Sequence, residues 1–210
     1  PVVTTVHSDY RLDYLGRPVA RLSYGTNNMV ALRRVNFYIG VSDPMTDILI
    51  ERGFPADRIY TIYNGIDFKT PIQTIPKAEF LKSVGMDWQE GDVIAGIAAR
   101  LSPLKDIPTL LRAMKKVCEK SSHLKLLLAG DGEDREKLEN MAKELGIADR
   151  VCFAGWLGDI NSFYNAIDIN LLTSLSETFP YSLTEGTRMH RATIASNVGG
   201  VPVLIDDGVN

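Results

Sequence analysis

The stretch Val93-Ile94-Ala95-Gly96-Ile97-Ala98 decides the fold of this chain, because it contains no polar side chain. A strand with one face in water alternates apolar and polar side chains, so this run predicts a strand that is covered on both faces. Such strands are typical of parallel sheets that carry helices on either side.

Helical and strand patterns alternate after this strand. Apolar side chains recur at the spacing of one helix face at Ile107, Leu110, Leu111, Met114, Val117 and Cys118. Further strands are expected at 124–129, 151–153, 167–172 and 193–196, with helices from Glu133 to Gly146 and near 159–166 and 180–191. Strict alternation predicts a Rossmann-like α/β domain with a parallel sheet, whose ligands bind beyond the carboxyl ends of the strands.

The amino-terminal part resembles the end of another α/β unit in its pattern. Strands are expected at 2–6, 37–41 and 59–62, and helices at 19–35 and from Ser42 or Asp43 onward. The aperiodic stretch 70–76 contains two prolines and is expected to be the interdomain linker.

Two Rossmann-like domains therefore account for the chain. We predict the carboxyl-terminal part of one domain, with the linker, over residues 1–75, and a second domain that lacks its final elements over 76–210. The chain starts at Pro1 without a methionine and stops after Asn210 without a closing element, so we expect a fragment truncated at both ends.

Composition excludes several classes of protein. Among 210 residues, 23 are Lys or Arg and 26 are Asp or Glu, the net charge is −3, and 45% are hydrophobic. These values exclude collagen-like, disordered and coiled-coil chains, and they argue against a nucleic-acid-binding surface. No apolar run approaches the roughly 20 residues of a membrane-spanning helix. Cys118 and Cys152 lie in apolar patterns, so we expect two buried free thiols in a reducing, cytoplasmic compartment.

Two cations flank the loop after the strand at 93–98. Arg100 and Lys105 stand five residues apart, between the carboxyl end of a parallel strand and a helix. Arginine grips two phosphate oxygens at once and lysine supplies a compact charge, so the pair fits a diphosphate. Ordinary surface cations in a solvated loop remain an equally good interpretation of the spacing alone.

Two carboxylates follow the strand at 167–172. Glu177 closes the loop and Glu185 lies eight residues on, in the next helix. Both are suited to accept hydrogen bonds from sugar or ribose hydroxyls, while the backbone N–H groups at the helix start suit phosphate oxygens. The alternatives are a helix cap with a solvated helix residue, or the acid and base of a hydrolase.

Other motifs give weaker signals. Gly130-Asp131-Gly132 begins like a dinucleotide-binding fingerprint, but Arg135 stands where the third glycine is needed, which disfavours an NAD-linked enzyme. His7 follows the strand at 2–6, at a position where α/β units present ligands, although an isolated histidine is more often structural. No Cys and His spacing indicates a metal site, and acidic residues near 131–134 suit the first turn of a helix.

The order of these motifs resembles the family-4, or group 1, retaining glycosyltransferases, which have the two-domain GT-B architecture. The resemblance rests on Arg100 to Lys105, on Glu177 with Glu185, and on the following glycine-containing stretches and amino-terminal motifs: Gly130-x-Gly132, Phe153-x-Gly155, Val198-Gly199-Gly200-Val201-Pro202, Thr4-Thr5-Val6-His7, Val41-Ser42 and Asn64-Gly65-Ile66-Asp67. It implies transfer of a sugar from a nucleotide-diphosphate-sugar donor to an acceptor hydroxyl, without metal or other cofactor and without a protein nucleophile.

The resemblance also implies roles for individual residues. Arg100 and Lys105 hold the diphosphate and stabilise it as it leaves. Glu185 binds the ribose hydroxyls, while Glu177 and His7 face the transferred sugar. Backbone groups of the donor site come from Phe179, Pro180 and Tyr181 and from the loops that contain Gly130, Asp131 and Gly155. The implied partners are the donor and a carbohydrate or lipid-linked acceptor, with peripheral contact to the cytoplasmic membrane through the region upstream of Pro1.

Three departures from the family pattern concern this site. Asp106 replaces the glycine after the phosphate-binding lysine, Thr178 replaces the glycine after the first glutamate, and Gly186-Thr187-Arg188 replaces a small apolar continuation. Because the acceptor-binding half is expected upstream of Pro1, we expect the fragment alone to be inactive. The alternatives are a nucleotide-sugar epimerase, a phosphorylase, or a non-catalytic GT-B-like module that binds a nucleotide.

Overall fold

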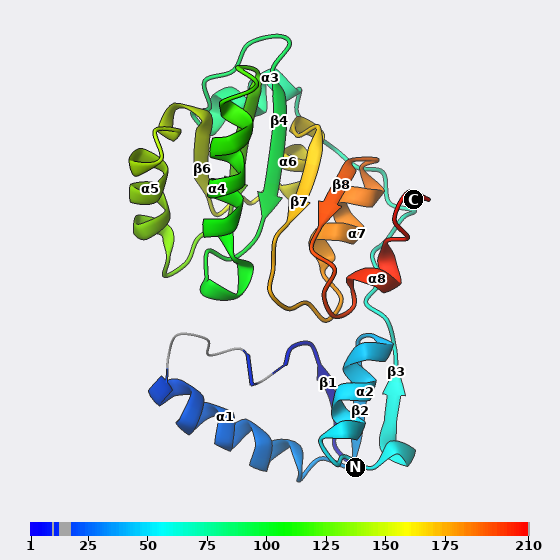
Figure 1. The fold of residues 1–210 in the computed structure, drawn as a ribbon. Helices are drawn as coiled ribbons and strands as arrows, with labels where there is room; N and C mark the ends of the chain where they lie inside the picture. Colours follow the sequence, from blue (N-terminus) through cyan, green and yellow to red (C-terminus); the bar gives the residue numbers. More distant parts are fainter. Residues whose placement is uncertain (10, 13–17, 210) are drawn as a thin grey trace. The chain divides into compact units, whose positions relative to one another are not determined.

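The computed structural model describes residues 1–9, 11–12 and 18–209, and it divides into two compact units (Figure 1). Unit 1 comprises residues 1–65, 175–181 and 197–210, and unit 2 comprises residues 66–174 and 182–196. Within the described ranges, no helix combines the length and the apolar character needed to span a membrane. The domain boundary that we placed after residue 75 stays a prediction.

Unit 2 is built on a five-stranded parallel sheet. Its strands are β4 (Val93–Ala98), β5 (Leu124–Ala129), β6 (Val151–Gly155), β7 (Ile169–Leu172) and β8 (Ala192–Ala195). Their order in the sheet is β6-β5-β4-β7-β8, with every pair parallel. The chain moves outward from β4 to β6 and then returns to β7 on the other side of β4. The carboxyl ends of β4 and β7 therefore form the topological switch point, where ligands bind in such sheets.

Helices cover both faces of this sheet, which confirms the expectation for the apolar strand at 93–98. Helices α4 (Ile107–Cys118) and α5 (Arg135–Glu144) cover one face, and α3 (Lys77–Ser83) and α6 (Ile160–Ala166) cover the other (Figure 1). Leu126 and Leu128 of β5 pack in the cluster with α4 and α5, whereas Leu127 and Ala129 pack with α3 and α6. Alternate side chains of one strand thus supply two cores.

Unit 1 contains a three-stranded parallel sheet. Strands β1 (Val3–Val6), β2 (Phe37–Gly40) and β3 (Ile59–Thr61) lie in that order, with helices α1 (Pro18–Leu32) and α2 (Asp43–Glu51) between them in the chain. Ser42 is the N-cap of α2, because its Oγ accepts a hydrogen bond from the N–H of Met45 at 3.3 Å, and Pro44 occupies the first turn. Unit 1 also contains the short helix α8 (Val201–Leu204).

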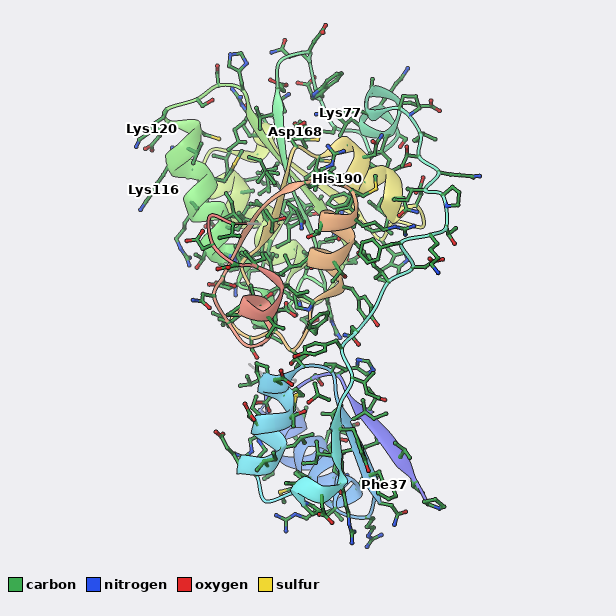
Figure 2. The ribbon with its side chains drawn as sticks, turned by 90° about the vertical axis from the view of Figure 1, so that its right-hand side faces the viewer. Phe37, Lys77, Lys116, Lys120, Asp168 and His190 are labelled. Carbon is green, nitrogen blue, oxygen red and sulfur yellow. The ribbon has the colours of Figure 1, made fainter. Side chains whose placement is uncertain are left out.

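The aperiodic segment 70–76 is anchored to unit 2. The N–H of Ile75 donates to Oγ of Ser162 in α6 at 2.9 Å. Immediately after the segment, Nζ of Lys77 lies 2.8 Å from both carboxylate oxygens of Asp168, and Figure 2 labels both side chains. Side chains far along the sequence therefore fix the stretch that we expected to act as a linker.

Both cysteines are free thiols, as expected. Cys118 and Cys152 are partly rather than fully buried, because each lies at the margin of a hydrophobic cluster. Burial raises the pKa of both thiols, so both favour the protonated form.

Candidate functional site

A cavity of about 650 Å³ lies in unit 2, at the carboxyl ends of β4, β5 and β6. Its size is within the range of small-molecule sites. Four residues that the sequence singled out line it: Arg100, Gly130, Asp131 and Glu185. The rest of the lining is mostly apolar and includes Ala98, Ala99, Ala129, Trp156, Leu157 and Ile160, together with Gly132 and Gly158.

Two glycines shape the cavity wall because two loops approach each other closely. The N–H of Ala99, after β4, donates to the carbonyl oxygen of Ala129 at 2.9 Å. A Cβ on Gly130 would lie 2.0 Å from the carbonyl oxygen of Ala99, and a Cβ on Gly132 would lie 2.3 Å from that of Leu101. Gly130 also has a φ of +123°, which favours glycine. The Gly-x-Gly motif therefore joins the β4 and β5 loops, which explains it without a dinucleotide fingerprint.

Arg100 is already paired with a carboxylate. Its Nε and Nη2 donate to Oε2 of Glu133 at 3.2 and 3.0 Å. The Arg100 side chain is 65% exposed, and exposed pairs of this kind contribute only about 0.2–1 kcal/mol. An anion in the cavity would therefore displace Glu133 from Arg100 at a modest cost in free energy. Sequence reasoning missed this partner, because it assigned Glu133 only to the start of a helix.

Lys105 ends a short 3-10 helix, Pro103–Lys105, and is not part of the cavity lining. Its carbonyl oxygen accepts a hydrogen bond from Oγ1 of Thr173 at 2.8 Å, which joins the loops after β4 and β7 across the switch point. The next residue, Asp106, has φ and ψ of 44°, in the left-handed region. Glycine adopts this conformation without steric cost, which gives a physical reason for the glycine of the family pattern.

Glu185 lies in helix α7 (Tyr181–Arg188), and its side chain accepts a hydrogen bond from a tyrosine. Oη of Tyr164, a side chain that is only 1% exposed, donates to Oε2 of Glu185 at 3.0 Å. Burial raises the pKa of Glu185 above its ordinary value, although the hydrogen bond from Tyr164 opposes this effect. Burial and the charge of Glu185 raise the pKa of Tyr164, so its hydroxyl stays a neutral donor.

Five further sequence-predicted residues belong to unit 1: His7, Glu177, Phe179, Pro180 and Tyr181. Oγ1 of Thr178 donates to the carbonyl oxygen of His7 at 2.5 Å, and Nδ2 of Asn64 donates to the carbonyl oxygen of Phe179 at 3.1 Å. The structure thus brings His7 together with the segment that contains Glu177, Phe179, Pro180 and Tyr181. The side chain of Thr178, where the family pattern has glycine, makes one of these contacts.

The glycine pair Gly199-Gly200 supports the same segment. A Cβ on Gly199 would lie 1.7 Å from the carbonyl oxygen of Glu177, and a Cβ on Gly200 would lie 1.8 Å from that of Thr178. The N–H of Gly200 donates to the carbonyl oxygen of Glu177 at 3.0 Å. These glycines therefore hold the backbone at Glu177 in place.

Gly155 and Trp156 connect the end of β6 to the cavity. The carbonyl oxygen of Gly155 accepts a hydrogen bond from the N–H of Gly130 at 2.7 Å, and Gly155 has a φ of +71°. Trp156 is 85% exposed, which is unusual for a tryptophan. Sequence reasoning named Gly155 and missed Trp156, although the residue directly follows the motif.

No metal site is evident among the described residues, because no three His, Cys, Asp or Glu side chains are grouped so that they could hold an ion. Carboxylates near the cavity are instead engaged with cations or hydroxyls, as Glu133 and Glu185 show. The groups that face the cavity suit an anion at Arg100 and hydroxyls at Glu185.

Comparisons with known proteins indicate the family of this chain. The family model for group 1 glycosyl transferases matches residues 83–210, and that for glycosyltransferase family 4 matches residues 1–70. An uncharacterized glycosyltransferase of Methanocaldococcus jannaschii is 32% identical over 161 residues, which are 74% of this chain and 40% of that protein. The O-antigen biosynthesis glycosyltransferase WclY of Escherichia coli is 28% identical over 69% of this chain and 39% of its own length.

A solved structure extends the likeness to the whole chain. HepE of Anabaena, in complex with UDP-glucose, superimposes with a TM-score of 0.81 and 25% identity, over 100% of this chain and 57% of HepE. This chain therefore spans about half or less of the length of these proteins. Together with the parallel α/β sheets, these matches show that the chain belongs to the group 1 glycosyl transferases and has the GT-B type of fold.

Proposed function

We propose that the cavity of unit 2 binds a nucleotide-diphosphate-sugar, and that the chain is the donor-binding part of a retaining, metal-independent glycosyltransferase. One observation carries this proposal: a cavity at the carboxyl end of a parallel sheet is lined by an arginine and a half-buried carboxylate within a mostly apolar wall. HepE, a structural neighbour, was solved with UDP-glucose, which supports a donor of this class.

In this proposal, the diphosphate, the ribose and the base of the nucleotide each contact different residues of the site. Arg100 binds the diphosphate, and Lys105 adds a second cation from the same loop. Glu185 accepts hydrogen bonds from the ribose hydroxyls. Trp156, with Leu157 and Ile160 beside it in the lining, offers a flat apolar surface to the base. Stacking of a base on an aromatic side chain is worth about 1–3 kcal/mol.

Catalysis in this proposal is mainly electrostatic. The bond between the sugar and the diphosphate breaks, and negative charge develops on the leaving diphosphate. Cations placed at that charge stabilise the transition state, so a divalent metal ion is not required. Glu177 and His7 of unit 1 act on the transferred sugar, and the acceptor is a carbohydrate or lipid-linked hydroxyl. The name of WclY, an O-antigen biosynthesis enzyme, is consistent with such an acceptor.

Isothermal titration calorimetry tests the donor site. The chain is titrated with UDP, GDP and ADP in the presence of EDTA, and again with magnesium. We expect one diphosphate to bind without metal and Arg100→Ala to weaken it by about tenfold or more, as expected for loss of a charge-assisted hydrogen bond.

Arg112→Ala is the matched control, because Arg112 is an exposed arginine of α4 outside the cavity lining. Binding that needs magnesium would contradict metal independence. The absence of binding to all three diphosphates under both conditions would contradict the donor site itself.

A further inference from the structure

The carboxylate of Glu185 uses only one of its two oxygens inside the protein. Oε2 accepts the hydrogen bond from Tyr164, and no hydrogen bond reaches Oε1 from any residue that the structure describes. Glu185 lines the cavity, whereas Tyr164 does not and is almost completely buried. The carboxylate thus stands between the tyrosine and the cavity, with one oxygen available to a ligand.

Tyr164 is placed for this contact by helix α6. Ile160, four residues earlier, lines the cavity, and side chains at i and i+4 share one face of a helix. The ring of Tyr164 packs in the hydrophobic cluster that α3 and α6 form with β4 and β5, and it contacts the ring of Phe163, with centroids 5.1 Å apart. A side chain that is packed so firmly has little freedom to leave Glu185.

We propose that Tyr164 is a positioning residue for nucleotide recognition: its hydroxyl holds the Glu185 carboxylate in the orientation in which it binds the ribose hydroxyls. The inference rests on the proposed donor site and deepens it. The hydrogen bond restrains the position of Oε2, and it leaves Oε1 available to a ligand in the cavity that Glu185 lines. Burial raises the pKa of Glu185, and the hydrogen bond from Tyr164 opposes this effect because a hydrogen bond donated to a carboxylate stabilises its ionised form.

The matched pair Tyr164→Phe and Tyr38→Phe separates this role from a structural one. Each change removes one buried hydroxyl and keeps the ring; Tyr38 is 2% exposed, and its Oη donates to backbone carbonyls of Leu32 and Val35 in unit 1. Calorimetry measures the affinity of wild type and both variants for UDP and for dideoxy-UDP, which lacks both ribose hydroxyls. Thermal unfolding shows that each variant is folded at the titration temperature.

We expect wild type to prefer UDP over dideoxy-UDP, and Tyr164→Phe to weaken UDP binding by about tenfold while leaving dideoxy-UDP unchanged. Tyr38→Phe should leave the preference intact. Full preference for UDP in Tyr164→Phe would overturn the positioning role while the donor site stands. Equal binding of UDP and dideoxy-UDP by wild type would overturn the assignment of Glu185 to the ribose and therefore the role of Tyr164. The absence of UDP binding by wild type would overturn the donor site as well.

Discussion

Two carboxylates at opposite ends of the sheet in unit 2 have opposite surroundings. Asp92, just before β4, has a fully buried side chain whose Oδ2 lies 3.3 Å from Nζ of Lys125, itself only 7% exposed. Glu185, beyond the other end of the sheet, has only the neutral hydroxyl of Tyr164 as a partner among the described residues. One end of the sheet neutralises its buried charge internally, whereas the other leaves a carboxylate for a ligand.

The pKa values follow this difference. Burial by itself would raise the pKa of Asp92, but the N–H of Gln89 and the ammonium of Lys125 outweigh burial, and the pKa lies below its ordinary value. At Glu185, burial outweighs the hydrogen bond from Tyr164, and the pKa lies above its ordinary value. A half-buried carboxylate without a cation, at the end of the sheet where ligands bind, is typical of a functional group.

The largest expected effect comes from breaking the Asp92 pair. Lys125→Met should lower the free energy of unfolding by about 3–5 kcal/mol, because it leaves a buried charge without its cation. Urea denaturation measures the loss. The double variant Asp92→Leu/Lys125→Met should recover most of it, since it removes both charges; an equally unstable double variant would show that the site does not act as a pair.

The next effect concerns the cavity wall. Gly130→Ala should cost about 2–3 kcal/mol, because the new Cβ meets the carbonyl oxygen of Ala99 in a backbone conformation that already favours glycine. Gly146→Ala is the matched control, since Gly146 has a φ of +68° and a Cβ on it would meet no atom within 4 Å. That variant should cost only about 1 kcal/mol by urea denaturation, and equal losses would contradict the close approach of the loops.

A smaller effect is the pH dependence of stability, which should have opposite signs for Glu185 and Asp92. Because the folded-state pKa of Glu185 is raised, its contribution to stability is present below the unfolded-state pKa and is lost as pH rises through the folded-state pKa. The stability of wild type relative to Glu185→Gln should therefore fall as pH rises from acid to neutral.

Asp92 should behave in the opposite way. Its folded-state pKa is lowered, so its contribution is present above the unfolded-state pKa and is lost as pH falls through the folded-state pKa. The stability of wild type relative to Asp92→Asn should therefore rise with pH over the acid range. Denaturation curves recorded across the pH range measure how each stability difference changes with pH. Changes of the same sign for Glu185 and Asp92 would contradict the opposite pKa shifts of these two carboxylates.

The smallest effect concerns Glu133, which competes for Arg100. Glu133→Gln should strengthen binding of a nucleoside diphosphate by about twofold to fivefold, as expected for release of an exposed ion pair. Calorimetry measures this change. Glu136→Gln, an exposed neighbour in the first turn of α5, controls for the loss of one negative charge, and an equal gain there would show that Arg100 is not the reason.

Sequence alone predicted the parallel α/β fold, because the covered strand at 93–98 and the helical stripe from Ile107 are local patterns. It also identified Arg100, Gly130, Asp131 and Glu185, which the structure gathers in one cavity. It could not predict Tyr164, since that tyrosine meets Glu185 across 21 residues of chain. Partners of this kind depend on how α6 and α7 pack, which no spacing encodes.

One departure from the family pattern has a tertiary cause. A Cβ on Gly186 would lie 2.3 Å from Nδ2 of Asn170, a fully buried amide on β7 that donates to the carbonyl oxygen of Ser182. Glycine in α7 therefore accommodates a polar side chain beneath the helix. The sequence showed the substitution, and only the packing of α7 on β7 gives its reason.

The most direct test of the donor site is a crystal structure of this chain grown with UDP and EDTA. We predict the diphosphate at Arg100, the ribose hydroxyls at Glu185 and the base against Trp156. A nucleotide bound elsewhere on the chain, or a ribose that contacts neither oxygen of Glu185, would contradict the assignment of this cavity as the donor site.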